Sequence, residues 1–530
     1  FNNFTEYIPS LIGRLTQLAS LSLSSNNLTA SIPSEVGVLT RLTSLSLYSN
    51  KLTGRIPSEI GGMTSLSYLY LSSNKLTGNI PSQIGKLTRL SHLILGENEL
   101  IGSIPDEIGA LKNLETIELQ SNELTGTIPL EICTLKKLKW MKLSLNALTG
   151  TIPSEIGVLT DLKFLSLFSN TLSGSIPSQI GAISSLSHLH FGVNELRGSI
   201  PSEFGNLTSL SSLELDKNQL TATIPSEIGS LVGLSYLYLH WNRLTGGIPS
   251  EIGAMTSISH LSMSYNRLSG RIPSEIGMMT GLSKLHLGSN QLSGSIPHEI
   301  GACTGLTSLE LEFNQLTGSF ASQIEGLTSL VSLSLFSNQL TGTIPSEIMA
   351  LKNLSYLYLH ANLLTGEIPS EIWVLENLTH LFLSSNALTG GIPFLLGRLQ
   401  KLLELDLDTN QLTGYIPSEI GALTSLTNLN LYNNTLLGPI PSEIGSLKNL
   451  TTLDLRYNAF TGAIPSELGL LSSACLFLIG KNEFVHAAES KPDTICLAMV
   501  FSNWDSVVFV DGNDFNFMPS EVEELLCVDV

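Results

Sequence analysis

The sequence predicts an α/β solenoid, an elongated array in which short parallel strands alternate with short helical or 3-10 turns. Two observations predict this fold. One asparagine recurs every 24 residues, from Asn2 and Asn26 through to Asn482, without one insertion or deletion. Nineteen of the 22 prolines occupy a single slot seven residues after that asparagine, as Pro33 and Pro57 do. A fixed period of this length is typical of repeat proteins, in which each copy buries its apolar face against its neighbours.

The residues before the asparagine predict a short strand. Around Leu45 and Leu47, apolar and polar residues alternate, as they do in a strand with one buried face. Because this segment has the same place in every copy, the strands should stack in parallel, about 4.8 Å apart.

The residues after the asparagine predict a second extended piece followed by a turn. Proline cannot donate a hydrogen bond to a neighbouring strand, so the proline slot should end the extended piece L-T-G-x-I-P. The segment S-E-I-G-x-L that follows should form a short turn that packs its apolar side chains inward. The asparagine amides should form a ladder that satisfies backbone groups in the dry core. The glycine of L-T-G should be required by its backbone conformation.

One copy, written from Leu45, reads L-S-L-Y-S-N-K-L-T-G-R-I-P-S-E-I-G-G-M-T-S-L-S-Y-L. It resembles the plant-type leucine-rich repeat, LxxLxLxxNxLTGxIPxxIGxL, and the resemblance covers about 480 of the 530 residues. The resemblance implies a right-handed superhelix with a parallel β-sheet on its concave face and the turns on its convex face. It also implies an extracellular recognition or adhesion module, like the ectodomain of a receptor-like protein.

Composition and motifs exclude several functional classes. The 45 acidic residues outnumber the 26 basic ones and give a net charge of -19, whereas nucleic-acid binding needs clustered lysine and arginine. The longest apolar stretch, from Ile495 to Phe501, is too short to span a membrane. The sequence contains no phosphate-binding loop, zinc-binding helix or serine-nucleophile motif. We therefore expect no enzyme, no cofactor and no metal site.

The two ends of a solenoid need caps, because the apolar core is open there. We expect the repeat array to cover residues 1–482 in about 20 copies, with the N-terminal cap missing or truncated because the chain starts within a copy at Phe1. Residues 483–530 break the 24-residue rule and should form the C-terminal cap. In a secreted protein Cys496 and Cys527 are the first candidates for a disulfide there, with Cys475 as a third candidate.

Two further features concern the cysteines and the asparagines. Cys133 and Cys303 occupy core positions and should be buried thiols. Seven N-x-[ST] sequons favour a secretory route and an extracellular or cell-surface location. The candidate glycosylation sites are Asn3, Asn27, Asn206, Asn353, Asn377, Asn433 and Asn449.

The candidate ligand-binding surface is the concave side of the sheet. Positions seven, six, four, two and one residues before the asparagine should face this side, and most copies fill them with serine or threonine. Aromatic and imidazole side chains at these positions are the usual makings of binding hot spots. The alternative is that the rings only pack against each other across the strands. The candidate residues are Tyr236, Tyr238, His240, Trp241, His260, Tyr356, Tyr358, His360, Trp140 and Phe164.

Charged and titratable residues also lie in these columns. Eight of the ten histidines fall there, so a surface whose contacts depend on pH is one hypothesis. One strand is acidic, with Glu404, Asp406 and Asp408, and Glu310 and Glu312 precede it by four copies.

The partners that these features suggest are a protein, peptide or glycan ligand and a co-receptor or matrix partner, with no nucleic acid. The competing class is a secreted structural protein of the cell wall or cell surface, in which uniform copies serve as a rod. A third hypothesis, ice binding, rests on a threonine column such as Thr29, Thr53 and Thr77. Other residue types, Leu437 among them, interrupt that column.

Overall fold

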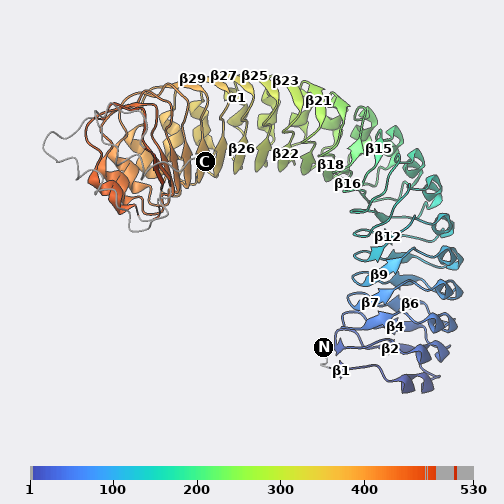
Figure 1. The fold of residues 1–530 in the computed structure, drawn as a ribbon. Helices are drawn as coiled ribbons and strands as arrows, with labels where there is room; N and C mark the ends of the chain where they lie inside the picture. The colour runs from blue at the N-terminus through green and yellow to red at the C-terminus, as the bar shows by residue number, and fades with distance from the viewer. Residues whose placement is uncertain (1–3, 472, 474–475, 485–506, 510–530) are drawn as a thin grey trace. The chain divides into compact units, whose positions relative to one another are not determined.

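The computed structural model describes residues 4–471, 473, 476–484 and 507–509. The chain divides into two compact units, Phe1–Leu268 and Ser269–Val530, and each consists of the same coil repeated. In each coil a strand of the main sheet is followed by an extended segment and then by a short helix, which is a 3-10 helix in all described copies but one (Figure 1). The predicted α/β solenoid of parallel strands and 3-10 turns is therefore confirmed within each unit.

The main sheet of the first unit is a parallel stack in which each strand pairs with the strand one copy further on. Its strands are β2 (Ser20–Ser22), β4 (Ser44–Ser46), β6 (Tyr68–Tyr70), β8 (His92–Ile94), β10 (Thr116–Glu118), β12 (Trp140–Lys142), β13 (Phe164–Ser166), β14 (His188–His190), β16 (Ser212–Glu214), β18 (Tyr236–Tyr238) and β20 (His260–Ser262).

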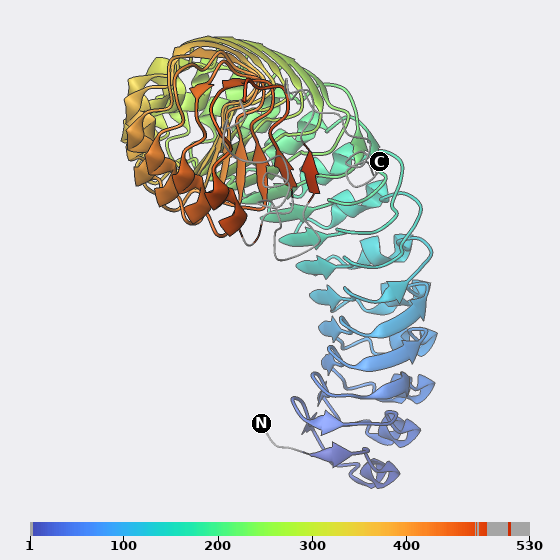
Figure 2. The same cartoon turned by 60° about the vertical axis from the view of Figure 1, so that its left-hand side comes forward.

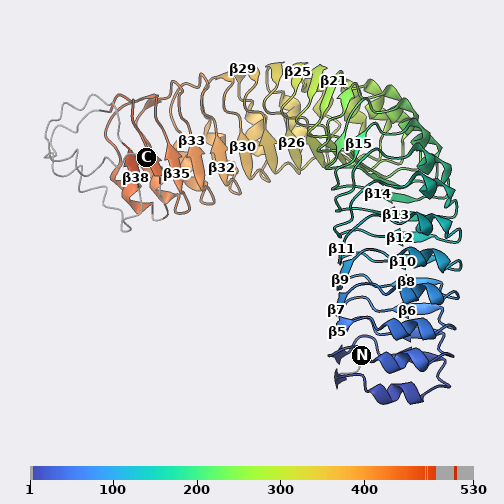
Figure 3. The ribbon, with the colours of Figure 1, turned by 45° about the vertical axis from the view of Figure 1, so that its right-hand side comes forward.

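A second set of short strands and a row of 3-10 helices complete the coils of the first unit (Figure 3). The second strands are β1 (Thr5–Glu6), β3 (Asn27–Leu28), β5 (Thr53–Arg55), β7 (Lys75–Gly78), β9 (Glu99–Gly102), β11 (Glu123–Leu124), β15 (Arg197–Gly198), β17 (Gln219–Leu220) and β19 (Thr245–Gly246). The 3-10 helices are η1 (Ser10–Arg14), η2 (Ser34–Val38), η3 (Ser58–Gly62), η4 (Ser82–Lys86), η5 (Asp106–Ala110), η6 (Leu130–Thr134), η7 (Ser154–Val158), η8 (Ser178–Ala182), η9 (Ser202–Asn206), η10 (Ser226–Ser230) and η11 (Ser250–Ala254).

The second unit has the same three rows (Figure 2). Its main-sheet strands are β22 (Lys284–His286), β24 (Ser308–Glu310), β26 (Ser332–Ser334), β28 (Tyr356–Tyr358), β30 (His380–Phe382), β32 (Glu404–Asp406), β33 (Asn428–Asn430), β35 (Thr452–Asp454), β37 (Leu476–Leu478) and β38 (Val507–Phe509). Its second strands are β21 (Arg267–Gly270), which begins in the first unit, β23 (Gln291–Gly294), β25 (Gln315–Gly318), β27 (Gln339–Gly342), β29 (Leu363–Glu367), β31 (Ala387–Thr389), β34 (Leu437–Gly438) and β36 (Ala459–Phe460).

The turns of the second unit include the one α-helix among the described residues, α1 (Ala321–Ile324). A proline precedes every 3-10 helix in an extended conformation, as Pro57 does with φ -67° and ψ 139°. Ala321 stands in the proline slot of the α1 copy, so the residue before it is free to leave the extended region. The 3-10 helices are η12 (Ser274–Met278), η13 (His298–Ala302), η14 (Ser346–Ala350), η15 (Ser370–Val374), η16 (Phe394–Arg398), η17 (Ser418–Ala422), η18 (Ser442–Ser446) and η19 (Ser466–Leu470).

The recurrent asparagine forms the predicted structural ladder. Asn170 is only 8% exposed, and its Nδ2 donates to the carbonyl oxygens of Leu143 and Leu167 at 3.0 Å each. Its Oδ1 accepts a hydrogen bond from the Leu148 N–H at 3.0 Å. One amide therefore joins its own copy to the copy before it, and the leucine and isoleucine side chains of these coils form the buried core.

Two backbone positions of the coil lie in the left-handed region. The L-T-G glycine does so as predicted, for example Gly54 with φ 72°. The residue immediately before the asparagine does so as well, although it is not glycine. Trp241 and Tyr265 both have φ 56° there, and serine, leucine, valine and lysine take the same conformation in other copies.

Candidate functional site

The side chains of each main-sheet strand divide between the core and an open face. In β18 the central Leu237 is fully buried, whereas Tyr236 and Tyr238 lie on the open face. In β2 and β4 these open-face positions hold serine, as the repeat consensus has it. Rings on this face therefore stand on a scaffold that the buried leucines fix.

The predicted residues Trp140 and Phe164 lie on β12 and β13, and their rings continue to two histidines on β14. The Trp140 and Phe164 rings stack with centroids 5.5 Å apart, and Phe164 continues to His188 at 5.3 Å and to His190 at 5.2 Å. The Lys142 ammonium group lies 5.5 Å from the Phe164 ring centroid. The structure thus places Trp140 and Phe164 in one continuous run of rings with two histidines.

The other predicted residues of the first unit lie on β18 and β20 and just after β18. Tyr236 packs against His260 at 5.1 Å, and Trp241 stacks on Tyr265 at 4.0 Å with an interplanar angle of 8°. Tyr236 remains 41% exposed and Trp241 51% exposed. The rings therefore pack against each other across the strands and still present large surfaces. We call this set the ring row, comprising Trp140, Phe164, His188, His190, Tyr236, Tyr238, His240, Trp241, His260 and Tyr265.

Strand β16 lies between these two groups of rings and carries no ring. Its Glu214 lies 3.4 Å from His190 on one side, and Asp216, just beyond the strand, lies 3.6 Å from His240 on the other. Glu214 also accepts a hydrogen bond from Ser212 Oγ at 3.2 Å. Sequence reasoning missed this carboxylate pair. The segment L-E-L-D-K-N was the signal, since it puts acids in two open-face columns of one copy.

Burial controls the ionisation of this centre. Burial lowers the pKa of His190 to about 4 and also lowers the pKa of His240, although Asp216 opposes the second shift. Burial likewise raises the pKa of Glu214 and of Asp216. The histidines are therefore neutral at neutral pH, and their contacts with the carboxylates are not ion pairs there.

The predicted residues of the second unit form a separate ring cluster. Tyr356 stacks on His380 at 4.9 Å, and Tyr358 packs edge-on against Phe382 at 5.1 Å. His360 stacks on Phe336 at 4.3 Å, a neighbour that the sequence analysis did not name. Tyr356 is 37% exposed, so this cluster also presents surface.

The acidic strand β32 lies beside this cluster and supplies a pH-dependent group. Burial, followed by the charge of Asp408, raises the pKa of Asp406 to about 6 from an ordinary value of 3.8, while the Ser384 hydrogen bond at 2.8 Å opposes the shift. The folded protein thus holds this proton more tightly than the unfolded chain does. Stability should therefore fall as the pH rises from about 4 to above 6.

Asp406→Asn should remove this pH dependence. Because it eliminates a buried charge, we expect it to raise the free energy of unfolding of the second unit by about 1–2 kcal/mol at pH 7.5 and to leave it unchanged near pH 3.5. Urea denaturation at both pH values measures the difference. Glu419→Gln, which changes an exposed carboxylate in η17, is the control. A constant offset between Asp406→Asn and the unsubstituted protein at both pH values would contradict the assignment.

The comparisons with known proteins place these coils in a family. Family models described as leucine rich repeats match residues 16–76, 64–124 and 304–364. A shorter model of the same description matches residues 209–231, 233–255, 257–279, 281–303, 377–399, 401–423, 425–447 and 449–471. The chain belongs to the leucine-rich repeat family. A search of curated protein sequences finds no significant match.

Solved structures similar to this leucine-rich repeat chain include plant receptors. The ectodomain of the Arabidopsis receptor kinase HAESA, in complex with an N-terminally extended IDA peptide hormone, is 35% identical over 96% of this chain and 86% of its own, with a TM-score of 0.86. HAESA with IDA and the co-receptor SERK1 is 34% identical over 95% and 89%, with a TM-score of 0.81. The plant peptide hormone receptor RGFR1, in complex with RGF2, is 36% identical over 91% and 85%, with a TM-score of 0.79.

The leucine-rich repeat array shows no catalytic domain in the part of the chain that the structure describes. Within those residues, no three histidine, cysteine, aspartate or glutamate side chains are grouped so that they could hold a metal ion. No described helix is long and apolar enough to cross a membrane.

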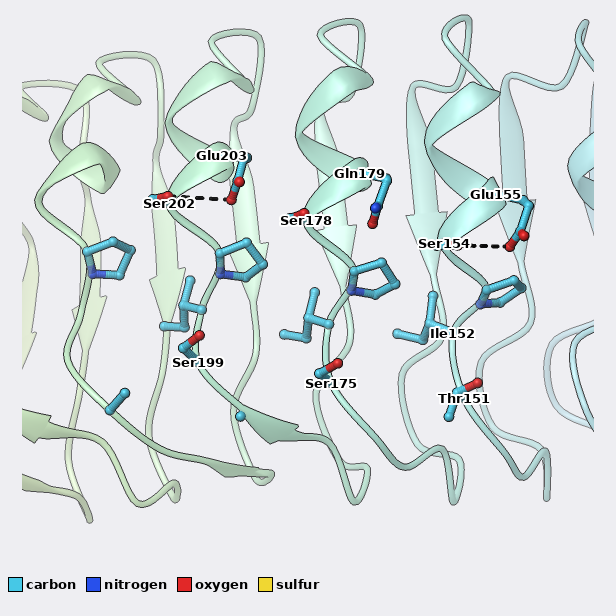
Figure 4. Close-up of a pocket in the computed structure, with 18 of the residues that line it drawn as sticks. Thr151, Ile152, Ser154, Glu155, Ser175, Ser178, Gln179, Ser199, Ser202 and Glu203 are labelled. Carbon is cyan, nitrogen blue, oxygen red and sulfur yellow. Dashed lines mark hydrogen bonds between the residues drawn. The ribbon is translucent and has the colours of Figure 1, made fainter.

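The leucine-rich repeats also form a shallow groove of about 1150 Å³ on one flank of the first unit, away from the open face of the main sheet. Its walls consist of the same slots of successive copies. One such slot holds Thr151, Ser175 and Ser199 (Figure 4). Ser154 donates a hydrogen bond to Glu155 at 3.0 Å, so polar groups along the groove satisfy each other. The groove contains none of the predicted binding residues.

The remaining predicted sites lie partly inside the described array. Asn206, Asn353, Asn377, Asn433 and Asn449 are exposed and Asn27 is half-buried, whereas Asn3 lies outside the described residues. Cys133 and Cys303 are buried free thiols, as predicted, and burial raises the pKa of each to about 11. The candidate disulfide residues Cys496 and Cys527, together with Cys475, lie outside the described residues.

Proposed function

We propose that this leucine-rich repeat chain is an extracellular recognition module that binds a peptide or protein ligand on the open face of its main sheet. The observation that carries the proposal is the ring row of the first unit. Its Trp140, Tyr236 and Trp241 rings are 39%, 41% and 51% exposed, at positions where other copies hold serine. Large rings on a rigid scaffold lose little conformational entropy on binding and are enriched among binding hot spots.

The similar receptors support this proposal. The HAESA ectodomain was solved in complex with the peptide hormone IDA, HAESA was also solved with IDA and the co-receptor SERK1, and the plant peptide hormone receptor RGFR1 was solved in complex with RGF2. By this relationship we propose a peptide ligand and a co-receptor or matrix partner for this chain. The exposed sequons support a secretory route, with glycans on the exposed asparagines. We further propose that residues 1–482 are the array and that residues 483–530 cap it.

Replacing Tyr236 and Trp241 with alanine should weaken ligand binding by at least about 30-fold, because a single hot-spot ring already contributes about 2 kcal/mol. A displayed library of linear peptides would be selected on the unsubstituted protein, and the affinities of the selected peptides would then be measured on the variant. A glycan array screened in parallel tests the alternative ligand class. The control variant is Tyr415→Ala, which removes a ring that is 64% exposed but lies outside the main sheet.

Equal affinity of the double variant and the unsubstituted protein would contradict the ring-row site. A protein that selects no peptide, binds no glycan and keeps its cellular role in the double variant would instead be the structural rod.

A further inference from the structure

The carboxylates of Glu214 in β16 and of Asp216 just beyond it differ from the other open-face glutamates of the first unit's ring region because they have no lysine or arginine partner. On the same face of the first unit, Glu115 pairs with Lys139 at 2.7 Å and Glu118 with Lys142 at 2.9 Å. Among the described residues, no lysine or arginine forms an ion pair with Glu214 or Asp216. Neutral imidazoles flank these two acids, Ser212 donates to Glu214, and the charge of Lys217 acts on Asp216 without forming an ion pair with it.

The chain makes room for the Asp216 carboxylate on one side. Gly192 occupies the same column one copy earlier, and a Cβ atom there would lie 2.6 Å from Asp216 Oδ1 and 3.2 Å from Phe168 Cδ2. Any larger residue at position 192 would therefore displace the carboxylate. Because Gly192 has no Cβ atom, the Asp216 carboxylate can lie between the Phe168 ring and the ring row.

Unsatisfied polar groups lie on the other side of Asp216. The column continues from Asp216 to His240 and then to Ser264, and the Trp241 N–H donates to the Ser264 carbonyl at 3.0 Å. Ser264 is only 7% exposed, and its Oγ has no hydrogen-bond partner. His240 Nδ1 is also buried without a partner. Asp216 is 7% exposed, so one row holds a buried acid followed by two groups that lack hydrogen bonds.

We propose that Glu214 and Asp216 bind one basic side chain of the ligand, an arginine or a lysine, while the ring row holds the ligand residues on either side. This inference names the ligand class of the proposed function and rests on it. A guanidinium group is planar, donates two parallel hydrogen bonds to carboxylates and stacks on aromatic rings. Phe168 and Tyr238 supply rings beside the pair. A bound cation would also offset the desolvation that both carboxylates undergo.

The chain contains its own control for this site. The same two columns hold Glu118 and Gln120 at a position 96 residues earlier, since 214 − 118 and 216 − 120 both equal 96. In that copy one acid is replaced by glutamine, and Lys142 neutralises the other. Glu118 should therefore take no ligand cation.

The test uses peptides selected from the displayed linear library on the full chain. Selected peptides should share an arginine or a lysine. Their affinity should fall at least tenfold on Glu214→Gln with Asp216→Asn, and less than twofold on Glu118→Gln. The amides keep the shape of the side chains and remove buried charge, and a thermal melt of each variant confirms folding.

A peptide in which glutamine replaces the shared basic residue completes a double-mutant cycle. The affinity of this peptide for the unsubstituted protein should be about tenfold lower than that of the selected peptide. The amide variant should bind both peptides with the same affinity. Selected peptides that need Trp241 but bind the amide variant with full affinity would overturn this inference and leave the proposed function standing. Failure to select any peptide would contradict the proposed function, and this inference would fall with it.

Discussion

Replacing Asn170 with alanine should lower the free energy of unfolding of the first unit by about 3 kcal/mol. The substitution leaves the Leu148 N–H without a partner in a dry core. It also removes one hydrogen bond from each of the Leu143 and Leu167 carbonyls, which keep a second one from the asparagine of a neighbouring ladder position. The unsatisfied N–H costs about 1–3 kcal/mol and each lost carbonyl hydrogen bond about 0.5–1.5 kcal/mol, and partial relaxation of the coil reduces the sum. The midpoint of urea denaturation, followed by circular dichroism, measures the effect.

Asn113→Ala is the matched control, because Asn113 is an exposed asparagine in the same unit. Its Nδ2 makes one hydrogen bond to the preceding copy, to the Thr88 carbonyl at 2.9 Å. We expect this change to lower stability by less than about 1 kcal/mol. Similar losses for both variants would mean that the ladder contributes no more than a surface hydrogen bond.

The second large effect should come from adding a single methyl group between two turns. In Gly229→Ala the new Cβ would lie 2.2 Å from the Glu251 carbonyl oxygen of the next copy, a distance that forces η10 and η11 apart. We expect a loss of about 2–4 kcal/mol, in the range of overpacked cores and strained backbones. Thermal unfolding should show it as a lower melting temperature.

Gly233→Ala tests the same change in the same copy where space exists. A Cβ atom at position 233 would meet no atom closer than 3.9 Å, and both glycines have ordinary φ values. We expect this variant to unfold within about 0.5 kcal/mol of the unsubstituted protein or to be slightly more stable. If the two variants unfolded alike, the backbone contact between neighbouring turns would not limit the spacing of the copies.

Much of the fold could be predicted from the sequence because the same residue types recur in fixed slots. The asparagine, proline and L-T-G glycine each meet a backbone requirement that few other residues can meet, so their period reveals the coil. The α1 turn was also open to prediction, since Ala321 is where the proline slot lacks its proline. The left-handed conformation at the position before the asparagine could not be predicted, because residues as different as serine and tryptophan occupy that position.

The candidate site was less open to prediction because its chemistry depends on neighbours 24 residues apart. The columns correctly placed Tyr236 and Trp241 on one face. In the sequence, the Glu214 and Asp216 carboxylates cannot be told from ordinary solvated surface, because their burial and their lack of a lysine or arginine ion pair depend on the neighbouring copies. Gly192 gave no sequence signal of its own, since glycine is common in this chain and its effect lies in the next copy.

The left-handed residue before each asparagine has a consequence for how this protein can change over evolutionary time. A residue with a Cβ atom is strained there by about 1 kcal/mol, and the strain belongs to the backbone rather than to any particular side chain. The ladder hydrogen bonds of the adjacent asparagine hold this conformation in every copy. Exchanging Ser for Leu, Lys, Trp or Tyr at this position therefore changes the surface without adding to the strain. The scaffold carries a row of freely variable positions along the rim of the open face of its main sheet, so the chemistry of that rim can change without loss of fold.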